Sequence, residues 1–150
     1  MGSILQAKCS CGFDSGELCL GGGRLTFETN CAFPCNCSSC GHLSTPNLFE
    51  SDNVCGECGK PGSTPYDDDV MVHPDSRVVE QPIGPVMTAV NKVLSVIPFR
   101  AAKAPEYDNS IFSWNAKGQL GRDLTLTENK YFCPQCENYN LTFECVGMWD

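Results

Sequence analysis

Basic residues are scarce in this 150-residue chain, which has ten Lys and Arg against eighteen Asp and Glu and a formal net charge of −8. Proteins that bind nucleic acid neutralise phosphate groups with Lys and Arg, so this balance disfavours a general nucleic-acid-binding role. Histidine is scarcer still, with only His42 and His73. Neither stands beside an obvious partner for acid–base or nucleophilic chemistry, and we therefore expect no hydrolytic enzyme.

Long apolar runs are also lacking. No segment approaches the roughly 20 apolar residues that a helix needs to cross a bilayer. Residues Met1 to Lys8 contain no basic stretch followed by a long apolar one, so we expect no export signal. These features predict a cytoplasmic protein with no membrane partner.

Cysteine, in contrast, is abundant, with twelve copies beside fourteen glycines and ten prolines. A small chain so rich in turn-forming residues needs cross-links to hold a fold. An even number of cysteines would suit a secreted disulfide framework. However, many of them stand in Cys-x-x-Cys pairs, which are awkward to bridge to each other but well placed to hold one metal ion. The pattern therefore favours metal over disulfides.

The strongest motif is Cys37-Ser-Ser-Cys40-Gly41 followed by Cys55-Gly-Glu-Cys58-Gly59. Each pair predicts a knuckle, a tight turn in which backbone N–H groups point at the sulfurs and glycine supplies the positive φ after the second cysteine. Two facing knuckles give tetrahedral coordination by four thiolates, which is typical of structural zinc. We expect a local zinc ribbon over 37–58, and the intervening residues 42–53 have room for a β-hairpin.

A second site is predicted from segments far apart in the chain. Cys133-Pro-Gln-Cys136 is one knuckle, and Cys9-Ser-Cys11-Gly12 is the best partner, although its Cys-x-Cys spacing is one residue shorter. The prediction is therefore two zinc ions, each held by four cysteines. Because a catalytic zinc keeps one position open beside three protein ligands, whereas these pairs count to four, we expect no enzyme.

Four cysteines remain without an assigned role: Cys19, Cys31, Cys35 and Cys145. Buried apolar side chains or free thiols are their simplest roles. Alternatives are that Cys35 competes with Cys37 or enters the second site, that Cys31 and Cys35 form a disulfide under oxidation, or that these thiols form a redox switch. His42 and His73 are alternative metal ligands, although a hairpin residue and a loop residue are the favoured roles.

Apolar and polar residues alternate over much of the chain and predict a mainly β fold. Short strands are expected at residues 4–8, 17–20, 24–29, 111–114, 124–126 and 140–146. The glycines at 21–23 predict a turn or a close backbone approach, since no Lys-Ser/Thr follows as in a phosphate-binding loop. One helix is expected over 85–98, where Pro85 suits its start, Pro98 its end, and an apolar stripe follows helical spacing.

Several segments carry a resemblance: residues 9–23, Cys31-Ala-Phe-Pro34 leading to the first knuckle, Pro65-Tyr66-Asp67-Asp68, Phe112-Ser-Trp114, Tyr131-Phe-Cys-Pro-Gln-Cys136 and Gly147-Met-Trp-Asp150. With them the chain resembles small uncharacterised bacterial zinc-ribbon proteins, over most of its length except about 70–108. The resemblance implies zinc binding and a cytoplasmic setting, and no activity. We expect a single zinc-ribbon domain over 1–150, in which about 70–108 is an insertion that carries the helix.

These features predict a zinc-binding, non-catalytic interaction or adaptor protein with a protein partner. An acidic surface favours a basic partner. One alternative is a rubredoxin-like iron electron carrier, because four thiolates in paired knuckles also hold a single iron, although the fourteen-residue gap between the pairs is short for that family. A nucleic-acid-binding or redox-sensing zinc ribbon is the other alternative.

Overall fold

The computed structural model describes residues 2–50, 53–76 and 109–149. These described residues form one compact unit. The helix predicted over 85–98 and most of the predicted insertion lie outside the described residues. The start of the segment assigned to the insertion belongs to the compact unit, because Met71 is buried in the core and Val72 forms a β-bridge with Tyr131.

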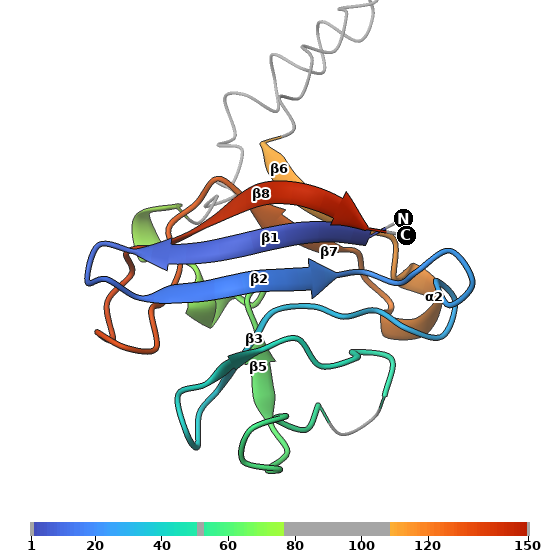
Figure 1. Ribbon diagram of the computed structural model, residues 1–150, viewed down its shortest axis with the longest axis horizontal. Helices are drawn as coiled ribbons and strands as arrows, with labels where there is room; N and C mark the ends of the chain where they lie inside the picture. The colour runs from blue at the N-terminus through green and yellow to red at the C-terminus, as the bar shows by residue number, and fades with distance from the viewer. Residues whose placement is uncertain (1, 51–52, 77–108, 150) are drawn as a thin grey trace, which may run out of the picture. The chain divides into compact units, whose positions relative to one another are not determined.

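A three-stranded antiparallel sheet joins the first and last described segments (Figure 1). Its middle strand is β1 (Gly2–Cys9), with β2 (Asp14–Leu20) on one side and β8 (Leu141–Trp149) on the other. The pairing of β1 with β8 runs from Gly2 opposite Trp149 to Cys9 opposite Leu141. Buried and exposed residues alternate along much of these strands, which is why the apolar–polar alternation predicted them.

Two smaller sheets complete the described part of the chain. In one, β3 (Cys35–Cys37) lies between β4 (Leu43–Ser44) and β5 (Ser63–Pro65). In the other, β6 (Ser110–Trp114) pairs with β7 (Leu124–Thr127), and a helical turn, α2 (Lys117–Leu120), lies between them in sequence. Two 3-10 turns follow β5, namely η1 (Asp69–Met71) and η2 (Pro74–Ser76). Among the described residues, no helix has the length and apolar character that a membrane crossing requires.

Three aromatic rings from separate segments meet in the core. Tyr66, Tyr131 and Phe143 contact one another edge to face, with centroids 5.2 to 6.1 Å apart, a geometry that aromatic pairs prefer. The hydroxyl of Tyr131 donates to the backbone oxygen of Thr127 at 3.2 Å. Phe143 lies in β8, Tyr66 follows β5, and Tyr131 lies two residues before Cys133. The cluster therefore packs the central sheet against the segment that follows β5 and against the segment that leads into Cys133.

The predicted mainly β fold is confirmed, with strands at or near five of the six expected places. The strand expected at 24–29 is wrong, because these residues form consecutive turns in which the Asn30 N–H donates to the Thr26 oxygen. Leu25 and Phe27 produced the alternating pattern, but they are 97% and 54% exposed. Both side chains are exposed, so their alternation does not correspond to a strand that packs on the core.

Residues 42–53 have room for a β-hairpin, but the described residues of this segment do not form one and pair elsewhere. Leu43 and Ser44 pair with β3, and Asn47 forms a bridge with Ala32. The side-chain oxygen of Asn47 accepts the Cys31 N–H at 2.8 Å. The Asn47 side chain thus takes the place of a backbone acceptor, and it holds this loop against residues that precede the first knuckle.

The triple glycine is a close backbone approach, as expected. A Cβ atom on Gly21 would lie 2.6 Å from the ring of Trp114, and one on Gly22 would lie 2.4 Å from the backbone oxygen of Asn30. Any larger residue would therefore have to displace the ring or the chain.

Candidate metal centres

Two groups of four cysteines bring their sulfur atoms together. We call the group Cys37, Cys40, Cys55 and Cys58 the ribbon site. We call the group Cys9, Cys11, Cys133 and Cys136 the sheet site, because Cys9 ends β1. Within each group all four Sγ atoms lie within 4.8 Å of one another. These are the same two sets that the sequence groups by spacing.

The sulfur separations match the edges of a tetrahedron around a metal ion. In the ribbon site the Cys37–Cys58 and Cys40–Cys55 sulfurs are 3.6 and 3.7 Å apart, and in the sheet site the Cys9–Cys136 and Cys11–Cys133 sulfurs are 3.7 and 3.8 Å apart. Zn–S bonds of about 2.3 Å place tetrahedral sulfurs about 3.8 Å apart. A disulfide needs about 2.0 Å, and all twelve cysteines, each of which lies in the described residues, are free thiols. The geometry fits two four-thiolate metal centres.

Both cysteine pairs of the ribbon site lie in the same kind of backbone turn. The Gly41 N–H donates to the Cys37 oxygen at 2.8 Å, and the Gly59 N–H donates to the Cys55 oxygen at 2.9 Å. These glycines have φ of +68° and +67°, a left-handed conformation that glycine adopts without steric cost. The Cys-x-x-Cys-Gly pattern therefore specifies the knuckle locally.

The sheet site uses two variants of this turn. The Gly12 N–H donates to the Cys9 oxygen at 3.0 Å, which closes the shorter Cys-x-Cys turn. In the other knuckle the Glu137 N–H donates to the Cys133 oxygen at 2.9 Å, and Glu137 has φ of +57°. Sequence reasoning missed this position, because no glycine follows Cys136 and nothing else in the sequence marks a positive φ.

Backbone N–H groups point at the sulfurs in both sites. Burial raises the pKa of the Cys37 thiol, but the N–H groups of Cys40 and Ser39 and the neighbouring thiols outweigh it, and the pKa falls to about 6. Burial likewise raises the pKa of Cys9, whereas the Cys11 N–H and the adjacent thiols bring it to about 7. One thiolate therefore forms readily in each site, and the thiolate is the form that binds metal.

Other thiols in the two groups keep their protons more strongly. Burial raises the pKa of Cys133 to about 12, and the thiols of Cys9 and Cys136 add to this effect. For Cys40, the His42 N–H lowers the pKa, but burial and its three sulfur neighbours outweigh it and raise the pKa to about 12. Four thiolates at these distances repel one another, so full deprotonation of a group needs a cation among the sulfurs.

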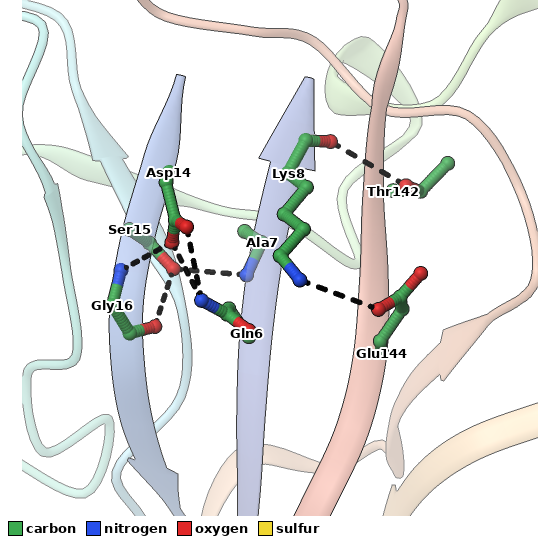
Figure 2. Close-up of polar contacts among 8 residues, drawn as sticks. All are labelled: Gln6, Ala7, Lys8, Asp14, Ser15, Gly16, Thr142 and Glu144. Atoms are coloured by element: carbon green, nitrogen blue, oxygen red, sulfur yellow. Dashed lines mark hydrogen bonds and ion pairs between the residues drawn. The ribbon is translucent and has the colours of Figure 1, made fainter. Parts of the chain in front are cut away.

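A side chain from β2 supports the end of β1 that carries Cys9. The pairing of β1 with β2 is irregular between Gln6 and Lys8, so Ala7 has no partner residue on β2. Instead, the Ala7 N–H donates to the hydroxyl of Ser15 at 2.9 Å (Figure 2). Because Ala7 is fully buried, this bond satisfies a backbone group that has no access to water.

Further polar contacts hold the same end of the sheet on its exposed face (Figure 2). The Gln6 amide donates to the Asp14 carboxylate at 2.8 Å, across β1 and β2. On the other side, Lys8 Nζ lies 3.8 Å from the Glu144 carboxylate, and the Thr142 hydroxyl donates to the Lys8 oxygen at 3.4 Å. Both neighbouring strands thus fix the residues that lead into Cys9.

The remaining four cysteines belong to neither group. Cys31 and Cys35 are fully buried, and the Cys35 thiol donates to the Phe33 oxygen at 3.5 Å. The alternative in which Cys35 replaces Cys37 or enters the second site is therefore wrong. Cys19 and Cys145 are exposed, on β2 and β8.

The two histidines also lie outside both groups. The backbone oxygen of His42 accepts the Cys37 N–H at 3.0 Å, and the ring of His73 contacts that of Tyr139 with centroids 5.7 Å apart.

Comparison with known protein families, curated proteins and solved structures gives no significant match. The assignment of metal sites therefore depends on the geometry of the thiols.

Proposed function

We propose that this chain is a non-catalytic, protein-binding adaptor whose fold is held by two structural zinc ions, one in each site. The observation that carries this proposal is the pair of four-cysteine groups, in which all sulfurs lie within 4.8 Å of one another and two separations in each group are 3.6 to 3.8 Å. These four separations equal the edges expected of zinc bound by four thiolates. Soft thiolate ligands in a tetrahedral arrangement favour zinc over the hard divalent cations.

Closed coordination supports a structural role for the metal. Four protein ligands leave zinc without an open position for water or substrate. A structural zinc contributes free energy of folding that a small, loop-rich domain lacks. Free thiols suit a reducing compartment, so we place the protein in the cytoplasm.

Charge supports the adaptor role. The chain carries −8 before metal is counted, and each four-cysteine zinc centre adds about −2. An acidic surface attracts a basic partner and raises the rate of its association. Binding to such a partner should weaken as salt is added, because salt screens exposed charges. Binding that does not respond to salt would contradict this role.

Native mass spectrometry with elemental analysis tests the proposal. The protein is expressed in medium that contains both zinc and iron and is then purified without chelator. We expect two zinc ions per chain, and a chelator should remove them. A chain free of metal, or one with a single ion, would refute the proposal of two structural sites.

A rubredoxin-like iron carrier is the second candidate, and one observation favours it. Cys11 and Cys40 are exposed, so each site has at least one ligand residue at the surface, which shortens the path for electron transfer to a partner. Iron held by four thiolates absorbs visible light, whereas zinc does not. A colourless protein as purified supports zinc, and a red protein whose colour is lost on reduction supports the iron carrier.

A further inference from the structure

A hollow of about 540 Å³ lies between the two metal sites. Its walls include Cys37 and Gly41 from the ribbon site's first knuckle and Pro134 and Glu137 from the second knuckle of the sheet site. The two knuckles are close, since a Cβ atom on Gly41 would lie 3.7 Å from the Pro134 oxygen. A side chain that enters this hollow meets both knuckles at once.

Glu137 stands where the other three knuckles have glycine. Its φ is +57°, against +95°, +68° and +67° for Gly12, Gly41 and Gly59. A residue with a Cβ atom is strained in this left-handed conformation, whereas glycine is not, so folding alone would favour glycine. Strained backbone at the wall of a ligand-sized hollow points to a use for the side chain.

Two aromatic rings form a corner of the same hollow. Phe132 and Tyr139 line it, with ring centroids 5.8 Å apart and planes at 71°. The Tyr139 hydroxyl donates to the Val70 oxygen at 2.9 Å, which holds this ring in place before any ligand arrives. Aromatic faces attract a cation that lies within about 6 Å of their centroids.

The charge on the walls of the hollow is negative. None of the described residues that line it is Lys or Arg, Glu137 is an acid, and Cys37 and Cys40 of the ribbon site form part of its walls. A positively charged group matches both the Glu137 carboxylate and the aromatic rings.

We infer that this hollow binds a lysine side chain presented by a basic partner protein, with its ammonium group between the Glu137 carboxylate and the rings of Phe132 and Tyr139. The inference rests on the proposed function, because it names the chemistry by which the adaptor recognises its partner. A cation fits better than an apolar side chain, since covering the Glu137 carboxylate without a partner would cost free energy of solvation.

The test is an NMR titration of the full, zinc-loaded chain labelled with ¹⁵N. The probe is a capped peptide, Gly-Ser-Lys-Ser-Gly, and the matched control peptide has norleucine, which is uncharged and of similar length, in place of lysine. We expect the lysine peptide to shift the amide signals of Gly41, Phe132 and Glu137. The norleucine peptide should leave them in place.

Three variants isolate the carboxylate. Glu137→Gln and Glu137→Gly should each weaken binding of the lysine peptide at least about threefold. Glu137→Gly should at the same time match or exceed the stability of the native chain, since glycine relieves the backbone strain. Glu17→Gln removes the same charge from an exposed position on β2, and it should leave the affinity within about 1.5-fold.

Several outcomes would overturn the inference. Equal binding of the norleucine peptide would make the hollow an apolar site, and an equal loss in Glu17→Gln would make the binding non-specific attraction to net charge. A chain with two zinc ions whose amides do not respond to lysine would sink the inference and leave the proposed metal sites standing. A folded chain without zinc would instead refute the proposed function.

Discussion

The sheet site and the ribbon site have the same sulfur geometry in very different surroundings. In the sheet site, Cys9 ends the eight-residue strand β1, which pairs along its length with the nine-residue strand β8. In the ribbon site, Cys37 ends β3, a strand of three residues between neighbours of two and three. Four thiolates are thus brought together in one case beside a long hydrogen-bonded ladder and in the other with very little regular structure.

This difference predicts an unequal dependence on metal. The ladder between β1 and β8 holds Cys9 close to the knuckle that precedes β8 through backbone hydrogen bonds that need no metal. The ribbon has few such bonds, so we expect most of its order to come from the ion proposed to bind there. The predictions below test this contrast.

Removal of both metal ions should have the largest effect. Structural zinc contributes about 10–16 kcal/mol of apparent binding free energy in zinc-finger peptides. With a chelator, we expect the amides of β3 and β5 to lose their protection from hydrogen exchange, while those of β1 and β8 keep part of it. Hydrogen exchange followed by mass spectrometry measures both. Equal loss of protection in the two sheets would contradict the contrast.

Loss of one cysteine ligand from either site tests the unequal dependence on metal separately for each site. Cys40→Ser and Cys11→Ser each remove an exposed sulfur, so neither change leaves a cavity in the core. We expect both variants to hold one zinc by native mass spectrometry. Amide exchange should rise through the ribbon in Cys40→Ser, and should remain slow in β1 and β8 in Cys11→Ser.

Cys19→Ser is the matched control, because Cys19 is exposed and belongs to neither site. It should retain two zinc ions and native exchange rates. If Cys11→Ser instead opened the central sheet while Cys40→Ser left the ribbon protected, the roles assigned to the two surroundings would be reversed.

The same contrast explains how much the sequence predicts. Cys-x-x-Cys spacing specifies a knuckle within a few residues. The two groups of four cysteines can therefore be predicted from the sequence. Strands such as β1 and β8 are long enough for alternation to appear. In β3, however, all three residues are buried, so no alternation marks the strand.

Other features depend on contacts that no local pattern reveals. The apolar residues Leu25 and Phe27 alternate like a strand, yet they lie in exposed turns. Asn47 fixes its loop through a side-chain bond to Cys31, sixteen residues away. The left-handed conformation of Glu137 is set by the knuckle around it. Glutamate as a residue type favours a negative φ, so the sequence gives no sign of this conformation.

The support behind the sheet site is expected to contribute less than the metal. Ser15→Ala leaves the buried N–H of Ala7 without an acceptor, which costs about 1–3 kcal/mol. Urea unfolding of the zinc-loaded protein measures this change. Ser113→Ala, at an exposed position on β6, is the control and should cost less than about 0.5 kcal/mol. Equal stability of the two variants would show that the bond to Ser15 does not stabilise β1.

Thiol reactivity is the mildest test, because it leaves the fold unchanged. In the zinc-loaded protein we expect iodoacetamide to modify Cys19 and Cys145, which are exposed. Cys31 should stay unmodified at pH 8, because burial both blocks access and raises its pKa to about 12. Peptide mapping by mass spectrometry identifies the modified residues. Rapid modification of Cys31 would show that the core opens without loss of metal.

X-ray absorption at the zinc edge tests the central claim most directly, combined with metal content from the same sample. We predict two zinc ions per chain and a single shell of four sulfur atoms at about 2.3 Å, with no nitrogen or oxygen ligand. A shell that contains nitrogen or oxygen would mean that the four-cysteine groups are not the ligands. A protein without zinc would contradict the account as a whole.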